Sequence, residues 1–307
     1  MPLLTTTPFQ HRFGYIPRSH RTVAMQDRVE QLMASLPKFK IDNPIGDPSG
    51  KRLVFWDFAK KLTGAHLPTF RQLIGDCVSM GAANVVNYLQ CRQIIASGLN
   101  RTYHPAYQPY IYGISRVQIG KGQLGNEDGS MGIWAAEGCK RYGVLRADFS
   151  GVPPYSAQVP KKWGYRPGPP SNFITEAKQY LVNTYASVTD YSDVIEALYN
   201  GYPVTVASMQ GFKMAPKVDR GKSWGIASGS WAHQMCFIGF DDNPSRPGCY
   251  CLNSWGPDAH GNPADDAPPG GFWVDADVVT RMVRQEDSFA YSEFAGFPGQ
   301  ELDFLLL

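Results

Sequence analysis

The chain has 307 residues, of which 43% are hydrophobic and 18% charged, and it contains 16 Tyr, 16 Phe and 7 Trp. This composition is typical of a folded, aromatic-rich protein and excludes a disordered one. There are 29 Lys and Arg against 27 Asp and Glu, a net charge of +2, and the basic residues form no stripe, so neither nucleic acid nor an acidic membrane is an expected partner.

Residues 1–52 are expected to form an N-terminal extension. This segment mixes Pro, Thr, Arg and Gln, with one amphipathic stretch at 26–36 and a turn-rich exit at 42–48. Its beginning lacks the features of a secretory signal, and no apolar run in the chain approaches the roughly 20 residues of a membrane span. We therefore expect an intracellular or particle-associated protein without a transmembrane segment.

Residues 53–170 are expected to form a mainly helical lobe. Apolar residues crowd every face of the segment 77–97, which predicts a long, buried helix. A second helix is expected over 133–142, ending at Gly143. Six prolines then fall between 153 and 170, and this density predicts the crossing between two lobes.

Residues 171–307 are expected to form a β-rich lobe. A short helix is predicted over 192–200, with Ser192 as its cap. Four runs rich in β-forming residues follow, separated by Gly, Pro, Asn and Asp, at 204–209, 233–240, 249–255 and 272–274. Helices first and strands later indicate an α+β protein with segregated halves.

Cys77 is the candidate nucleophile. It stands where the long helix begins, and at a helix start the unpaired backbone N–H groups and the helix dipole favour a thiolate. A lone cysteine is more often a small buried hydrophobic residue, so the interpretation depends on what accompanies it.

Two further residues give Cys77 a chemical context. His233 opens an apolar strand and is a candidate general base, and Asn253 follows 20 residues later in the run Asn-Ser-Trp-Gly. An Asn side chain can accept the N–H of a histidine ring and so fix the tautomer whose other nitrogen faces a thiol. Taken alone, each residue also fits a structural role.

In this order, the three residues resemble the papain-like cysteine peptidase family, and the resemblance spans roughly residues 53–290. It implies a two-lobe α+β fold with a helical lobe that supplies Cys77, a β-barrel-like lobe that supplies His233 and Asn253, and an active site in the cleft between them. It further implies that Gln72 and the Cys77 backbone N–H form the oxyanion hole, and that Trp255 shields the histidine–asparagine hydrogen bond from water.

The residues that flank Cys77 depart from the family pattern. Asp76 and Val78 stand where family members usually have Ser and Trp, and Gln72 is five residues before the cysteine instead of six. The Asp76 carboxylate opposes thiolate formation unless it points to solvent or to a cation. These departures put the level of activity in question.

Two functions are compatible with this pattern. The first is a cysteine endopeptidase or related thiol hydrolase that acts on a peptide or protein substrate. The second is a papain-like fold that serves as a structural or binding component of a larger assembly, such as a virus particle. A Cys-His-Asp triad that uses Asp241 or Asp242, as in transglutaminase-like acyltransferases, is a minor alternative, because these carboxylates more simply form a solvated turn.

No cofactor or metal is expected, because His11, His20, His66, His104 and His260 show no metal-ligand spacing. The apolar chain end Phe304–Leu307 and the extension are candidate contacts with an assembly partner. We expect the extension to dock outside the groove between the lobes rather than inside it, because it shows no inhibitory motif.

Overall fold

The computed structural model describes residues 13–37, 39, 45–98 and 101–294. The expected partner contact at Phe304–Leu307 lies outside these residues. The helices are η1 (Arg18–His20), α1 (Val23–Ala34), α2 (Phe55–Thr63), α3 (Cys77–Ser97), α4 (Gln108–Gly113), η2 (Ile114–Ile119), α5 (Gly132–Tyr142), α6 (Gln158–Trp163), α7 (Ser171–Ala177), α8 (Tyr191–Tyr199) and α9 (Ala276–Val283). The strands are β1 (Arg52–Val54), β2 (Val182–Ser187), β3 (Val204–Phe212), β4 (Lys217–Asp219), β5 (Lys222–Trp224), β6 (Ala227–Asp241), β7 (Gly248–Leu252), β8 (Gly271–Asp275) and β9 (Ser288–Phe294).

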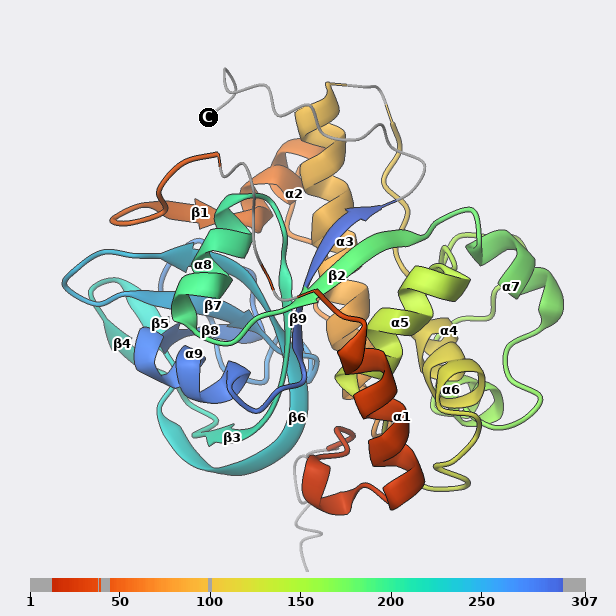
Figure 1. The fold of residues 1–307 in the computed structure, drawn as a ribbon. Helices are drawn as coiled ribbons and strands as arrows, with labels where there is room; N and C mark the ends of the chain where they lie inside the picture. Colours follow the sequence, from red (N-terminus) through yellow and green to blue (C-terminus); the bar gives the residue numbers. More distant parts are fainter. Residues whose placement is uncertain (1–12, 38, 40–44, 99–100, 295–307) are drawn as a thin grey trace, which may run out of the picture.

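Helix α3 is the central element of the fold. Its residues are buried from Cys77 to Ile94, which agrees with a sequence that is apolar on every face. The helix packs against α2, α4 and α5 and against the sheet, chiefly β6. In Figure 1 it stands between the helices on the right and the sheet on the left. Its first residue therefore lies at the junction of the two halves.

The described strands form one sheet of nine, in the order β2-β9-β3-β6-β7-β8-β5-β4, with β1 added beside β6. The sheet is not closed, because β2 and β4 at its two ends are not paired to each other. The expected α+β fold of papain-like type is confirmed, but "barrel-like" describes the second lobe only loosely. The longest strand, β6, pairs with β3, β7 and β1 and carries His233 near its middle.

Several element predictions are confirmed and others need correction. The helix predicted over 77–97 coincides with α3, and the one predicted over 133–142 is α5. Ser192 is not the cap of α8: Asp190 is the N-cap, and its side chain accepts a hydrogen bond from Asp193 N at 2.9 Å. Asp190 has the extended backbone that a cap requires, whereas Ser192 is already inside the helix.

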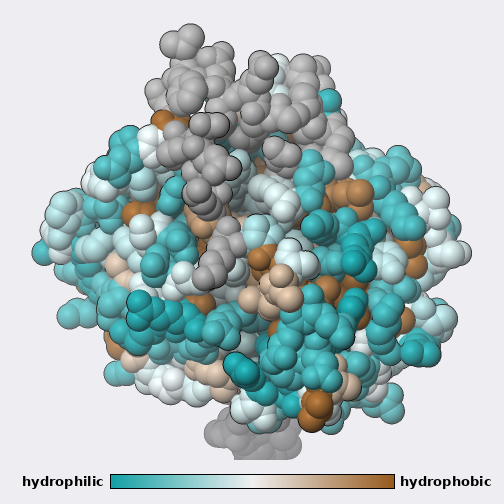
Figure 2. All heavy atoms as spheres, viewed as in Figure 1, coloured by the Kyte–Doolittle hydropathy of each residue, from teal (hydrophilic) through white to brown (hydrophobic). Residues whose placement is uncertain are grey.

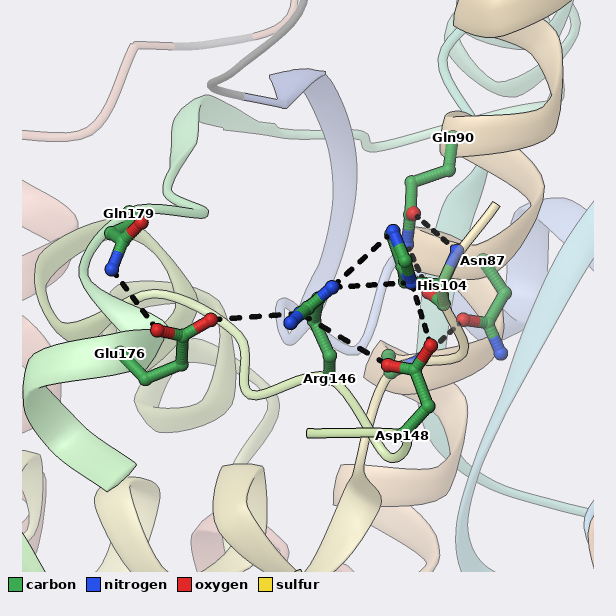
Figure 3. Close-up of polar contacts among 8 residues, drawn as sticks. Asn87, Gln90, His104, Arg146, Asp148, Glu176 and Gln179 are labelled. Atoms are coloured by element: carbon green, nitrogen blue, oxygen red, sulfur yellow. Dashed lines mark hydrogen bonds and ion pairs between the residues drawn. The ribbon is translucent and has the colours of Figure 1, made fainter. Parts of the chain in front are cut away.

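The proline-rich segment packs against the helices. Tyr107, Trp163 and Phe173 belong to a second buried cluster beside the main core. A cluster of polar side chains lies in the same region (Figure 3). His104 pairs with Asp148, and Arg146 lies between this pair and the carboxylate of Glu176 on α7. This arrangement ties α7 to the loop that precedes α4.

The part of the extension that the structure describes begins at residue 13. Residues 13–16 form an extended segment, called the strap below, and η1 then leads into α1, whose cap Thr22 accepts a hydrogen bond from Met25 N. Helix α1 lies in front of α5 in Figure 1 and packs against it. Figure 2 shows mainly hydrophilic residues on this face of the molecule, with apolar ones scattered among them.

All six cysteines are buried and reduced. Over the described part of the chain, no helix combines the length and apolar character needed to cross a membrane. Among the same residues, no three His, Cys, Asp or Glu side chains gather in a way that could hold a metal ion.

Candidate active site

Cys77 is the first residue of α3, and it faces β6. The loop from Gln72 to Asp76 brings the chain to this point, and Asp76 is the N-cap residue. Backbone groups of Gln234 and Gly14 hydrogen-bond to the thiol, so the sulfur lies beside the strand residue that follows His233 and beside the strap. The structure thus brings Cys77 next to β6 at the position of the candidate base.

The Cys77 thiol is fully buried. Its pKa is raised to about 12: burial is the main cause and the Asp76 carboxylate adds to it, whereas hydrogen bonds from the backbone of Gln234, Gly14 and Val78 act in the opposite direction. The expected lowering of the pKa at a helix start is therefore outweighed in this state. The physical reason is desolvation, since a thiolate without contact to water loses most of its hydration.

His233 and Asn253 are in direct contact. His233 Nε2 and Asn253 Oδ1 are 2.8 Å apart, and both side chains are buried. Ser254 N donates to the same Oδ1 at 2.7 Å, and a backbone N–H can only donate, so this atom of the amide is the acceptor. His233 therefore carries its proton on Nε2, and its Nδ1 is the nitrogen able to accept a proton.

Asn253 itself lies one residue beyond the end of β7, not within the strand as expected.

Aromatic rings cover this hydrogen bond. The ring of Trp255 lies 4.7 Å from that of His233, and Trp231 packs 4.8 Å from Trp255. On the strap, Phe13 presents its ring edge-on to both His233 and Trp255, at 6.2 and 6.0 Å. Such a cover excludes water and strengthens the electrostatic interactions beneath it.

Gln72 is buried beside the Asn253 loop. Its Oε1 accepts a hydrogen bond from Ser254 Oγ at 2.7 Å, and its backbone N donates to Ser254 O. The amide nitrogen, Nε2, donates to Ile74 O at 3.0 Å.

Asp76 is buried, so its carboxylate does not point to solvent, one of the two arrangements considered from the sequence. Instead, Tyr155 donates its hydroxyl proton to Asp76 Oδ2 at 2.9 Å, and the same hydroxyl accepts a hydrogen bond from Leu73 N. Tyr155 comes from the proline-rich segment. That segment therefore helps to hold the loop that presents Cys77.

The strap crosses between the two halves at Cys77. Tyr15 N donates to Ala232 O at 3.2 Å, Ser130 N donates to Gly14 O at 2.8 Å, and Ile16 N donates to Ser130 O at 2.9 Å. Tyr15 and Ser130 form a parallel β-bridge. The expectation that the extension docks outside the groove is wrong: backbone hydrogen bonds that composition does not reveal hold it across the Cys77 position.

A buried ion pair fastens the extension further along. Arg21 and Asp287 are 3.1 Å apart, with side chains only 5% and 2% exposed, and Arg21 Nε also donates to Ile16 O. Asp287 in addition accepts hydrogen bonds from Gly132 N and Ile133 N at the start of α5. Burial raises the pKa of Asp287, while Arg21 and these two backbone donors lower it.

Sequence reasoning missed one residue of the site. His260, set aside because it lacked metal-ligand spacing, is buried against Asn253: its Nε2 is 2.9 Å from Asn253 Nδ2, and its Nδ1 is 2.9 Å from Met214 O. In the sequence, only its position seven residues after Asn253 could have indicated that His260 belongs to the site. The polar residues around it in the chain concealed its burial.

The alternative acidic residues lie elsewhere. Asp241 and Asp242 are eight and nine residues after His233, which corresponds to about 26 Å along an extended strand. Asp241 is paired with Lys222, and Asp242 accepts hydrogen bonds from Tyr191 and Gly50 N. Neither belongs to the group around Cys77.

Comparisons with known proteins agree with this architecture. No protein-family model matches the chain, and no curated protein matches it in sequence. Among solved structures, xylellain, a cysteine protease from Xylella fastidiosa, is 15% identical; the match covers 92% of this chain and 91% of xylellain, with a TM-score of 0.55.

Two more solved structures show the same likeness. Procathepsin B from Trypanosoma congolense is 12% identical over 92% of this chain and 91% of its own, with a TM-score of 0.53. The bromelain protease from Ananas comosus, solved in complex with the E64 inhibitor, is 18% identical over 78% of this chain and 98% of its own, with a TM-score of 0.50. The chain therefore has the fold of the papain-like cysteine proteases.

Proposed function

We propose that this protein is a cysteine peptidase that hydrolyses peptide bonds with Cys77, His233 and Asn253. The observation that carries the proposal is the 2.8 Å hydrogen bond between His233 Nε2 and Asn253 Oδ1; His233 stands on β6, which packs against α3. It supports a neutral imidazole whose Nδ1 can accept the thiol proton.

The proposed reaction has two stages. His233 Nδ1 takes the proton of Cys77, and the thiolate attacks the carbonyl carbon of the substrate; the negative oxygen of the intermediate is stabilised by the Cys77 backbone N–H and by Gln72 Nε2. His233 then gives the proton to the leaving amine. Water, activated by the same nitrogen, hydrolyses the thioester and regenerates the thiol.

The state described by the structure is latent under this proposal. The strap occupies the position next to Cys77, and the thiol has no exposed surface. Procathepsin B, which has a similar fold, is by its name a proenzyme. We infer that the extension of this chain acts as a built-in inhibitor and that a substrate must displace it or find it already removed.

The test uses the full chain with the strap disturbed by the variant Gly14→Ala. We expect E64, the inhibitor in the bromelain complex, to add its mass to the peptide that contains Cys77, and a mixture of peptides to be cleaved. Cys77→Ala in the same background abolishes both results and leaves the thermal unfolding transition little changed, because it acts on chemistry more than on packing. Hydrogen exchange of the strap amides verifies that the strap has moved.

The second hypothesis, a structural or binding component, rests on the burial of Cys77 and its raised pKa. It predicts that Cys77 stays unmodified even when the strap has moved. Equal peptide cleavage by the chain with and without Cys77 would also contradict the peptidase proposal.

A further inference from the structure

Asn253 stands between two histidines. Its Oδ1 faces His233 Nε2 at 2.8 Å, and its Nδ2 faces His260 Nε2 at 2.9 Å. The Asn253 side chain is fully buried, and His260 is only 4% exposed. Nothing in the proposed reaction requires the second histidine, so its contact with Asn253 calls for a separate explanation.

Two backbone groups, Ser254 N–H at one end and Met214 O at the other, determine where the protons lie in this series of hydrogen bonds. Ser254 N–H can only donate, so the Asn253 atom that it contacts at 2.7 Å is the oxygen. Met214 O can only accept, so His260 Nδ1, 2.9 Å away, carries a proton. The two ends are independent of each other and lead to the same assignment.

With these two assignments, only one pattern of donors and acceptors is consistent for His260, Asn253 and His233. With its proton on Nδ1, a neutral His260 offers Nε2 as an acceptor, which receives a hydrogen bond from Asn253 Nδ2–H. Asn253 Oδ1 then accepts from His233 Nε2–H, and the proton-free nitrogen of His233 is Nδ1. Each group in the series donates to the next.

We propose that His260 is a positioning residue for the reaction: it holds the Asn253 amide in the orientation that keeps the His233 proton on Nε2. The inference rests on the proposed function for its catalytic consequence, but the hydrogen-bond series exists irrespective of activity. His260 touches neither Cys77 nor the substrate position, so it acts only through Asn253.

The rings that pack on His260 hold it in place without replacing its hydrogen bonds. Trp231 stacks on it at 6.4 Å, Trp255 is tilted against it at 6.2 Å, and Phe272 meets it edge-on at 4.8 Å. A phenylalanine at position 260 keeps these aromatic contacts and removes the acceptor. A glutamine keeps an acceptor oxygen and removes the ring.

The direct test observes the His233 Nε2–H proton by NMR in the full chain with ¹⁵N-labelled histidine, and the variant His233→Ala assigns the signal. We expect His260→Phe to shift this signal or lose it through faster exchange with water, and His260→Gln to retain it. His66→Phe, a change at a histidine outside the site, is the matched control and leaves the signal unchanged.

The kinetic test uses the chain in which the strap has been displaced. We expect His260→Phe to lower kcat by about 10- to 100-fold with KM little changed, since a misplaced catalytic group costs rate rather than binding, and His260→Gln to recover most of the loss. If His260→Phe fails to fold, His260→Met replaces it, because Met matches Gln in length and lacks the amide acceptor.

The two proposals fail in different ways. An unchanged His233 signal in His260→Phe overturns the positioning role, whether or not the protein cleaves peptides. An altered signal, restored by His260→Gln, in a protein that cleaves no peptide even when the strap has been displaced supports the hydrogen-bond series and contradicts the peptidase function. An unchanged kcat in an active enzyme also overturns the role of His260.

Discussion

Gly14 is the point at which a single added methyl group should open the site. A Cβ built on Gly14 lies 1.9 Å from Gly75 O and 2.3 Å from Gly75 C, whereas ordinary contact begins at 3.4 Å. The two backbones must therefore separate by about 3.4 − 1.9 = 1.5 Å. Neighbouring side chains cannot relieve this clash, because both partners are main chain.

A separation of that size breaks the backbone hydrogen bonds that hold the strap. Three of them join it to Ser130 and Ala232. At roughly 1 kcal/mol each, their loss shifts the equilibrium between closed and open strap by about 3 kcal/mol, or about 10²-fold toward the open form. The reaction of Cys77 with iodoacetamide, which requires the open form, should accelerate by the same factor.

The pH dependence gives a second measure of the same change. In the closed chain burial raises the pKa of Cys77 from 9.0 to about 12, so its labelling rate should keep rising up to pH 10. When the strap is displaced and water reaches the thiol, the rate should level off at or below about pH 9. The raised pKa means that the closed chain holds the thiol form until strongly alkaline pH.

The assay is mass spectrometry of the Cys77 peptide over time, from pH 6 to pH 10. Val23→Ala, a change at a 79% exposed side chain of the same extension, is the control and leaves the rate unaltered. An unchanged labelling rate in Gly14→Ala, with hydrogen exchange showing that the strap amides have lost protection, would refute the proposal that the strap shields Cys77.

Three further predictions concern groups around the site. Arg21→Ala removes a cation from a buried pair and should lower the free energy of unfolding by about 3 kcal/mol in urea titrations, whereas Arg18→Ala, at an exposed pair, changes it by less than about 1 kcal/mol; equal effects would contradict this. Gln72→Ala should lower kcat by about 10²-fold in the opened chain with KM little changed, and steady-state kinetics will show whether it does. Tyr155→Phe removes the donor to a buried carboxylate and should cost about 1–3 kcal/mol in thermal unfolding; a neutral result would mean that another donor takes its place.

Parts of the fold that depend on local pattern could be predicted from the sequence. The pattern of the sequence predicts helix α3 over its observed range, because a segment that is apolar on every face allows few alternatives. The cap of α8 was assigned to Ser192 instead of Asp190, because both residue types are good caps and only the backbone distinguishes them. Strand β2 and its partner β9, which lie about 100 residues apart in the chain, were not predicted.

The site shows the same division between local and long-range information. Cys77, His233 and Asn253 were named from residue type and order, and the contact between the latter two is present in the structure. The burial of His260 depends on packing against residues on β6 and β8, which no local pattern encodes. The raised pKa of Cys77 likewise depends on what surrounds the thiol in the folded chain, and the strap is part of those surroundings.

The strap and the residues that it contacts belong to one polypeptide, so the proposed blocked state does not depend on protein concentration. A segment tethered this closely has an effective concentration on the order of millimolar at its own site, and dilution cannot lower it. A competing peptide must therefore reach comparable concentration or bind much more tightly to replace the strap. A single cut between the strap and the body would turn the same contacts into an ordinary bimolecular complex, which a large enough volume of buffer would dissociate.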